Sequence, residues 1–153
     1  MADIPTAGNF SLVAALESDF PAIRALINET GINPMGLDWR RFTLAKTGRG
    51  EMIGCGQLKP HGDGSLELAS IAVAPAWRKK GVASAIIGEL LSKAPRPLYL
   101  TCLSHNGPFY EKFGFRVIRG KELTPYFSRL SKLAGLAGAL TRMREKMLVM
   151  KLD

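Results

Sequence analysis

Residues 66–87 constrain the fold of this chain most, because they read as a strand, a basic turn and a helix in immediate succession. The run 66–73 is apolar apart from Glu67 and Ser70, which suits a strand buried on both faces. Arginine and two lysines at 78–80 then lead into a helix expected over 79–93. The first turn of a helix has N–H groups without partners inside the helix and lies at the positive end of its dipole. The stretch therefore predicts a place where phosphate can bind.

A further strand is expected at 98–103, after Pro95 and Pro97 have ended the helix. The strand–helix–strand run has the length of one βαβ unit, so its two strands should be parallel with a right-handed crossover. Apolar runs separated by turn residues complete a mixed α/β chain, which we expect to be a single domain over residues 1–153. The other expected strands are 10–16, 39–45, 51–58, 115–118 and 146–152, and the other expected helices run from a cap at Ser18 or Asp19 to Gly31, over 106–113 and over 125–140.

The turn at 60–64 predicts that the strands on either side of it form an antiparallel hairpin. His61 lies in this turn, and we expect its side chain to be exposed. Gly54 and Gly56 in the preceding strand indicate a bulge or a close backbone contact. Glu67 lies near the start of the following strand. Burial there would make an unpaired carboxylate costly, and it would raise the pKa of Glu67 so that the carboxylate becomes a stronger base. The alternatives are that Glu67 is exposed at the strand end or tied in a structural ion pair.

The formal net charge of +8 favours an anionic partner, such as nucleic acid, a membrane surface or a small molecule with phosphates. A basic solvated surface without a specific partner explains the charge equally well. We expect no specific nucleic-acid binding, because the sequence holds no helix-turn-helix or aromatic RNA-reading motif. We also expect no membrane span, because no apolar run reaches about 20 residues.

The two cysteines, Cys55 and Cys102, lie in apolar strand-like runs, so we expect buried free thiols rather than a disulfide. Residues 1–5 lack a basic stretch followed by an apolar run, which predicts a cytoplasmic protein without a signal peptide. Cys102, Ser104 and His105 come from one strand end and its loop, and we do not expect them to form a nucleophilic triad. No metal site is expected.

The basic turn contains the motif Arg78-x-x-Gly81-x-Ala83. It lacks the GKS/T ending of a nucleoside-triphosphate loop and the three glycines of a dinucleotide fingerprint. Together with the run FYEKFGF at 109–115, however, the segment 67–118 resembles the Gcn5-related N-acetyltransferase (GNAT) family. The turn matches that family's Q/R-x-x-G-x-G/A motif, and the second run is similar to its F-Y-x-K-x-G-F segment.

The resemblance implies the GNAT fold, a mixed and mostly antiparallel sheet with a splayed parallel pair of strands and flanking helices. It also implies acetyl-CoA as the donor and direct transfer of the acetyl group to a primary amine of a small molecule or a protein. The alternative is a catalytically weak sensor or regulatory module of the same fold that binds acyl-CoA. The resemblance places the donor against the strand and the turn, at Ile71, Ala72, Val73, Arg78, Lys79, Lys80, Gly81, Val82, Ala83 and Ser84.

In this family-based reading, main-chain N–H groups of 79–84 bind the pyrophosphate, and the N–H of Ile71 or Val73 polarises the thioester carbonyl. Tyr110 matches the family's general acid, and Glu67 aligns with the carboxylate that serves as base in some members. Asn106 is a candidate contact to the cofactor.

The acceptor should be set mainly by the loop 31–39, by the strands that follow it and by the segment 119–144. The helix over 125–140 is basic and amphipathic, so it fits packing on the sheet, a membrane-surface element, a homodimer interface or a substrate lid. Its apolar face contains Phe127, Leu130, Leu133, Ala134, Ala137 and Leu140.

Overall fold

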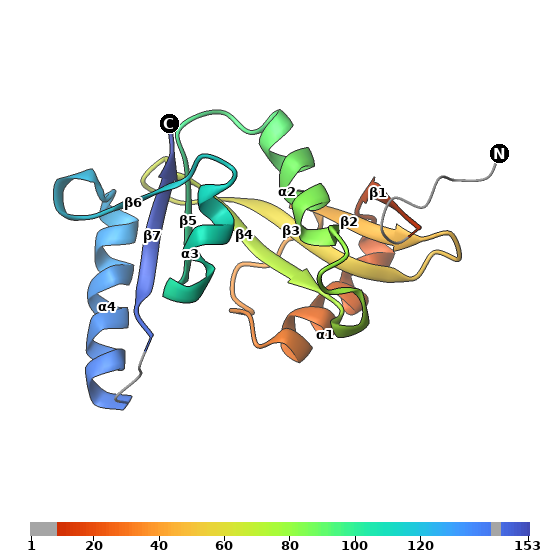
Figure 1. The fold of residues 1–153 in the computed structure, drawn as a ribbon, viewed down its shortest axis with the longest axis horizontal. Helices are drawn as coiled ribbons and strands as arrows, with labels where there is room; N and C mark the ends of the chain where they lie inside the picture. Colours follow the sequence, from red (N-terminus) through yellow and green to blue (C-terminus); the bar gives the residue numbers. More distant parts are fainter. Residues whose placement is uncertain (1–8, 142–144) are drawn as a thin grey trace. The chain divides into compact units, whose positions relative to one another are not determined.

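The computed structural model describes residues 9–141 and 145–153 (Figure 1). The expectation drawn from residues 1–5, and the part of the segment 119–144 that falls on 142–144, lie outside the described residues. The main elements are β1 (Phe10–Ala14), α1 (Phe20–Thr30), β2 (Phe42–Thr47), β3 (Met52–Pro60), β4 (Leu66–Val73), α2 (Val82–Lys93), β5 (Leu98–Leu103), α3 (Gly107–Glu111), β6 (Arg116–Ile118), α4 (Pro125–Thr141) and β7 (Met147–Leu152).

The strands form one mixed sheet of seven, hydrogen-bonded in the order β1-β2-β3-β4-β5-β7-β6. The predicted parallel pair is confirmed, because β4 pairs parallel with β5 through Glu67 and Tyr99. The chain divides into two compact units. Of the described residues, the first contains 9–59 and Leu68–Ala94, and the second contains Pro60–Glu67, 95–141 and 145–153.

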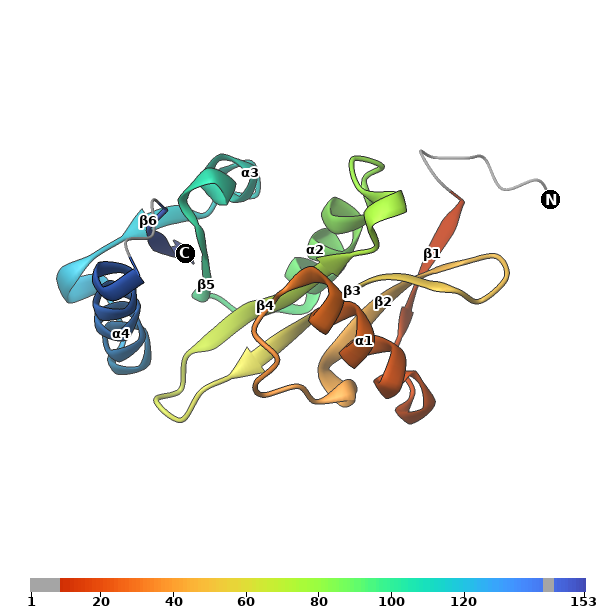
Figure 2. The same cartoon turned by 90° about the horizontal axis from the view of Figure 1, so that it is seen from below.

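In the first unit, β2 pairs antiparallel with β1 and with β3, and two helices cover opposite faces of these strands (Figure 2). The buried side of α1 contributes Ile23, Leu26 and Ile27 to a core that includes Leu44 and Cys55. Because side chains alternate between the faces of a strand, the residues on either side of Cys55 point to the other face, where α2 lies.

Gly54 and Gly56 are the residues that let α2 approach β3, which confirms the predicted close contact. A Cβ atom on Gly54 would lie 2.7 Å from Val82 Cγ1 and 3.0 Å from Ile86 Cδ1. A Cβ atom on Gly56 would lie 2.8 Å from Ile86 Cγ2. Since ordinary carbon contacts are about 3.5–4.0 Å, any larger residue at these positions would force the facing side chains to move.

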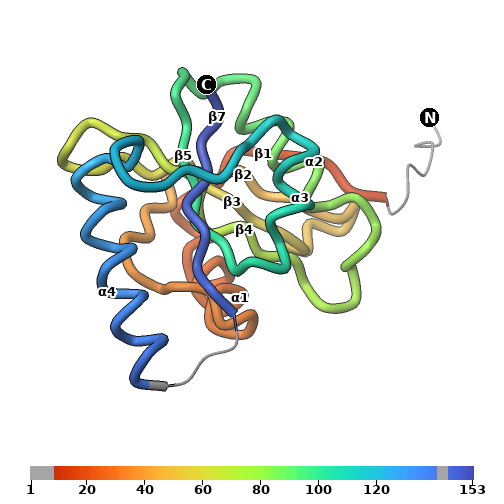
Figure 3. The backbone as a smooth tube through the Cα atoms, turned by 60° about the vertical axis from the view of Figure 1, so that its left-hand side comes forward, coloured from red at the N-terminus to blue at the C-terminus, as the bar shows by residue number. Residues whose placement is uncertain are grey.

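In the second unit, β7 lies between β5 and β6 and is antiparallel to both. Phe127 of α4 is fully buried against Tyr99, Ile118 and Val149. On the opposite face, Gly107 at the start of α3 approaches Leu148, the neighbour of Val149 in β7. Figure 3 shows α3 and α4 on opposite sides of β7.

Two element boundaries differ from prediction for local reasons. The expected strand 39–45 begins only at Phe42, because Trp39–Arg41 forms a 3₁₀ turn closed by the Asp38 side chain, which accepts a hydrogen bond from Arg40 N at 3.1 Å. The helix expected from residue 79 begins at Val82, because Gly81 just before it has a φ of 81°.

Helix α1 ends before Gly31, as predicted, and Gly31 is left-handed. Asp19, one of the two predicted caps, is the N-cap residue, but the predicted capping bond from its side chain is not formed. Within the described residues, no side chain caps α1. The Asp19 carboxylate instead accepts hydrogen bonds from Leu16 N at 2.8 Å and from Lys46 Nζ at 2.7 Å. It therefore ties the start of α1 to β2.

The predicted apolar face of α4 is only partly buried. Phe127 is inaccessible, whereas Leu133 is 64% exposed and Leu140 is 85% exposed. The expectation that β4 is buried on both faces is likewise only partly correct, since Glu67, Leu68 and Ala72 are buried and the rest of β4 is half-buried. Over the two described ranges, no helix combines the length and apolar character needed to cross a bilayer.

Candidate active site

The basic turn before α2 has a backbone suited to binding an anion. Lys79 has a φ of 60° and Gly81 a φ of 81°, both in the left-handed region that glycine adopts readily and lysine rarely. No side chain of the described residues caps the first turn of α2, and the first intrahelical bond there runs from Ala85 N to Gly81 O at 3.0 Å. The side chains of Arg78, Lys79 and Lys80 are exposed. Uncapped N–H groups, the helix dipole and three cations therefore fit a phosphate-bearing ligand.

The backbone of β4 is irregular at Ser70, directly before Ile71. Ser70 has a φ of 60°, which is uncommon for any residue other than glycine. Gln57 of β3 supports this conformation, because its Nε2 donates to Ser70 Oγ at 2.8 Å. Such irregular backbone inside a strand is typical of functional sites, where it redirects the N–H groups that follow.

Gln57 is fully buried and links two segments. Besides Ser70, its Nε2 donates to the carbonyl of Gly36 at 3.3 Å, which fixes the orientation of the amide. Among the described residues, Gln57 Oε1 has no hydrogen-bond partner. A buried acceptor without a partner costs about 1–3 kcal/mol.

Glu67 is buried, and its partner is His61, which we predicted to be exposed. Glu67 Oε1 lies 2.7 Å from Nε2 of His61, and the two side chains are 9% and 6% exposed. The prediction that His61 is an exposed loop histidine is therefore wrong. The hairpin turn buries its ring under α4, where it stacks on Tyr126. The expected burial of Glu67 is therefore confirmed, and the pairing that was its structural alternative is present as well.

Tyr110 lies in the short helix α3, with its ring edge-on to Phe109 and to Phe115. Burial raises the pKa of Tyr110 to about 12, and the nearby Cys102 adds to the shift. Its phenol therefore stays protonated throughout the ordinary working range. Asn106 is exposed at the residue that precedes α3.

The cysteines and the second histidine have no arrangement for nucleophilic catalysis. Burial raises the pKa of Cys102 to about 11 and that of Cys55 to about 12, so both remain thiols, which are poor nucleophiles. His105 Nδ1 instead pairs with Glu145 Oε1 at 2.6 Å on the surface. Across residues 9–141 and 145–153, no cluster of three or more His, Cys, Asp and Glu side chains could hold a metal ion.

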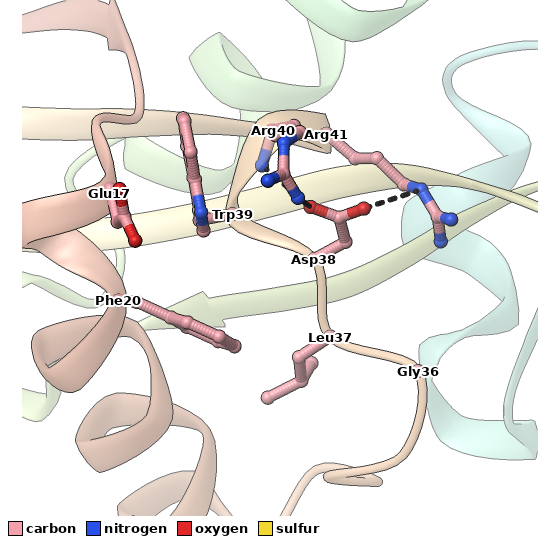
Figure 4. Close-up of a pocket in the computed structure, with 8 residues that line it drawn as sticks. All are labelled: Glu17, Phe20, Gly36, Leu37, Asp38, Trp39, Arg40 and Arg41. Atoms are coloured by element: carbon pink, nitrogen blue, oxygen red, sulfur yellow. Dashed lines mark hydrogen bonds and ion pairs between the residues drawn. The ribbon is translucent and has the colours of Figure 1, made fainter.

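A pocket of about 480 Å³ opens in the first unit between the start of α1 and the segment 36–41 (Figure 4). Its aromatic walls are Phe20 and Trp39, with the Glu17 carboxylate beside them. On its other side, Asp38 forms ion pairs with Arg40 Nη1 at 3.3 Å and with Arg41 Nε at 3.8 Å. This pocket includes part of the loop 31–39 that we expect to set the acceptor.

The predicted site residues fall into two groups, one in each compact unit. Ile71–Val73 and Arg78–Ser84 belong to the first unit, and Glu67, Asn106 and Tyr110 to the second. Sequence reasoning missed Gln57 and His61. For His61 a signal was present: if residues 61 and 65 pair across the hairpin, His61 lies on the same face of the sheet as Glu67 and diagonal to it.

Comparison with solved structures identifies the class of fold. Rv2747 from Mycobacterium tuberculosis, in complex with CoA and NLQ, is 24% identical over 93% of this chain and 98% of its own, with a TM-score of 0.71. An acetyltransferase of the GNAT family from Bacillus cereus is 17% identical over 95% of this chain and 98% of its own, with a TM-score of 0.64. The fold is therefore that of the GNAT acetyltransferases.

N-acetylglutamate synthase from Neisseria gonorrhoeae, complexed with coenzyme A and N-acetyl-glutamate, matches with a TM-score of 0.70 and 21% identity over 94% of this chain. That match spans only 35% of the synthase. A comparison with curated protein sequences found no match.

The family itself is shown by sequence. The family model for the acetyltransferase (GNAT) domain matches residues 38–117, which is more than half of the 153 residues. This chain belongs to the GNAT acetyltransferase family. GNAT domains use acetyl-CoA, in agreement with the predicted donor.

Proposed function

We propose that this chain is an acetyl-CoA-dependent N-acetyltransferase, a single domain over residues 1–153, which moves the acetyl group directly to a primary amine of a small molecule or a protein. The observation that carries the proposal is the turn before α2. Its backbone is left-handed at Lys79 and Gly81, three exposed cationic side chains lie in it, and the helix that follows has no side-chain cap from the described residues. This local geometry fits the pyrophosphate of CoA.

On the donor side, main-chain N–H groups of residues 79–84 bind the pyrophosphate, assisted by the side chains of Arg78, Lys79 and Lys80. The bound donor supplies a thioester carbonyl that a neutral amine can attack. The N–H of Ile71 or Val73 donates to that carbonyl oxygen and stabilises the negative charge that develops on it. The irregular backbone at Ser70 supports this role, because it sets the direction of the N–H groups that follow.

Glu67 takes the proton that the acceptor ammonium must lose before attack, directly or through water. Tyr110 interacts with the sulfur atom that leaves. A free thiol has a pKa near 8.5, so full proton transfer from a phenol of pKa about 12 is uphill by roughly 5 kcal/mol. We therefore propose that Tyr110 acts chiefly by donating a hydrogen bond to the leaving sulfur as the C–S bond breaks. The proton that the nitrogen loses as the amide forms neutralises the thiolate. Asn106 is a further cofactor contact.

The pocket of Figure 4 is our candidate for acceptor binding. Phe20 and Trp39 offer aromatic rings and Glu17 a carboxylate, a combination that can bind an organic ammonium group. That group would have to compete with Arg24, which lies 4.6 Å from the Phe20 ring centroid, and with Arg40, which lies 4.9 Å from the Trp39 ring centroid. Trp39→Leu should raise the KM for the amine and leave the Kd for acetyl-CoA unchanged. Trp77→Leu is the matched control: Trp77 packs against Lys80 of the basic turn, so its loss should affect acetyl-CoA instead.

The decisive experiment measures CoA release with a panel of amino acids, polyamines, aminoglycosides and peptide N-termini, together with acetyl-CoA binding by calorimetry. The panel begins with glutamate, because the compared synthase structure holds N-acetyl-glutamate. Turnover of one amine that falls in Tyr110→Phe and Glu67→Gln supports the proposal. Binding without turnover of any amine identifies the acyl-CoA sensor, and absence of acetyl-CoA binding refutes both readings.

A further inference from the structure

The two histidines of this chain each pair with a glutamate, in opposite surroundings. His61 and Glu67 are buried, with side chains 6% and 9% exposed and 2.7 Å between Nε2 and Oε1. His105 and Glu145 lie on the surface, with side chains 58% and 37% exposed. The same chemical pair is therefore present once in a fixed environment and once in solvent.

The ring of His61 is held by the first turn of α4. Tyr126 stacks on it with ring centroids 3.5 Å apart and an interplanar angle of 15°. Phe127 meets it edge-on at 5.6 Å. The stack leaves the imidazole little freedom to rotate away from Glu67.

Asp63 fixes the turn that carries His61 to the same helix. Its Oδ2 accepts a hydrogen bond from Tyr126 N at 2.9 Å, and its Oδ1 accepts from Ser65 N at 2.9 Å. These bonds lock the hairpin turn and the start of α4 together, so the position of His61 is set from both sides.

We propose that His61 is the positioning residue for Glu67. Its Nε2–H donates to Glu67 Oε1, holds the carboxylate in one rotamer and leaves Oε2 to take the proton from the acceptor amine. The proposal rests on the proposed function, in which Glu67 is the base. A glutamate has three side-chain torsions to order, and small misplacements of a catalytic group are expensive, so an anchored carboxylate reacts faster than a free one.

A double-mutant cycle tests the proposal, with rates measured on the amine that the panel selects. His61→Leu keeps bulk and removes the donor, and it should lower kcat roughly ten- to hundredfold with little change in the KM for acetyl-CoA. In the Glu67→Gln background the same substitution should have no further effect. His61→Gln, whose amide nitrogen can reach the Nε2 position, should recover most of the rate. His105→Leu should leave the rate at the wild-type value.

An equal loss from His61→Leu in both backgrounds would assign His61 a purely structural role and overturn the proposal. A wild-type rate in His61→Leu would overturn it as well, provided that Glu67→Gln is slow. If Glu67→Gln itself is as fast as wild type, the base assignment in the proposed function is what fails.

NMR of ¹⁵N-histidine-labelled protein without a histidine tag supplies a readout independent of activity. With two histidines there are two imidazoles to follow. Glu67→Gln should shift the ring signals of His61 and leave those of His105 in place, and Glu145→Gln should do the reverse. Unshifted His61 signals in Glu67→Gln would refute the hydrogen bond and the proposal with it.

Discussion

Gly56→Ala should destabilise the first unit by overpacking the contact between β3 and α2. The added Cβ would lie 2.6 Å from Ile71 Cδ1 and 2.8 Å from Ile86 Cγ2. A third methyl, Leu90 Cδ1, would be at 3.2 Å. Because three side chains must move at once, we expect a loss of about 1–3 kcal/mol in the free energy of unfolding. At this chain length, that lowers the melting temperature by roughly 2–12 °C.

Urea unfolding followed by tryptophan fluorescence measures this effect in the right place, because Trp39 and Trp77 both lie in the first unit. Gly88→Ala in the middle of α2 is the matched control. Apart from its chain neighbours and the adjacent backbone of α2, no heavy atom of the described part of the chain lies within 4 Å of the Cβ it would add, so helix propensity should stabilise it by about 1 kcal/mol. Equal stability of Gly56→Ala and wild type would refute the packing argument.

Four further outcomes are expected. Gly81→Ala meets open space but must keep a φ of 81°, so it should cost about 1–2 kcal/mol and weaken acetyl-CoA binding in calorimetry. The Tyr110 pKa of about 12 lies above the unfolded value near 10, so stability should fall by roughly 3 kcal/mol between pH 10 and 12, and urea midpoints of Tyr110→Phe should lack this loss. A serine hydroxyl bond is the main cause that lowers the pKa of Asp63, so its stabilising contribution is present above pH 4 and disappears on acidification; Asp63→Asn should flatten the acid limb of stability. On α4, exposed Leu133→Lys should stay within about 0.5 kcal/mol of wild type, whereas buried Phe127→Ala should lose about 3–5 kcal/mol in thermal unfolding.

The sequence predicted best where an apolar run is closed by strong turn residues. The bounds of β4 and β5 are those expected, because Gly64 precedes one and Pro97 the other. It predicted poorly where a side chain bonds the local backbone. The run from Trp39 has strand-like composition, but the Asp38 carboxylate closes a 3₁₀ turn that delays β2.

The candidate site was predictable in its local motifs and not in its long-range contacts. Arg78 to Ala83 follow a linear pattern whose geometry is set by Gly81 and its neighbours. The partner of Glu67 depends on which face of the hairpin α4 covers, and that is decided by Tyr126, about 60 residues further on. The expectation that His61 is exposed treated its turn as free of tertiary contacts. The hydrogen bond from Tyr126 N to Asp63 holds that turn against α4, and the His61 ring is buried there although residues 62–64 are exposed.

Strand β3 supports both parts of the proposed donor site, the basic turn before α2 and the irregular backbone of β4. The glycines of β3 can be read from the sequence, but the partners that they and Gln57 contact cannot. In β3, Gly54 and Gly56 face α2 and set how closely the helix start, with its basic turn, can approach the sheet. Gln57 follows at once and bonds Ser70, where the backbone turns left-handed just before Ile71. Alternation along the strand assigns these tasks to opposite faces. If the proposed donor site is correct, a change in β3 should therefore alter acetyl-CoA binding through glycine packing and the rate of transfer through Gln57, although neither residue type carries a catalytic group.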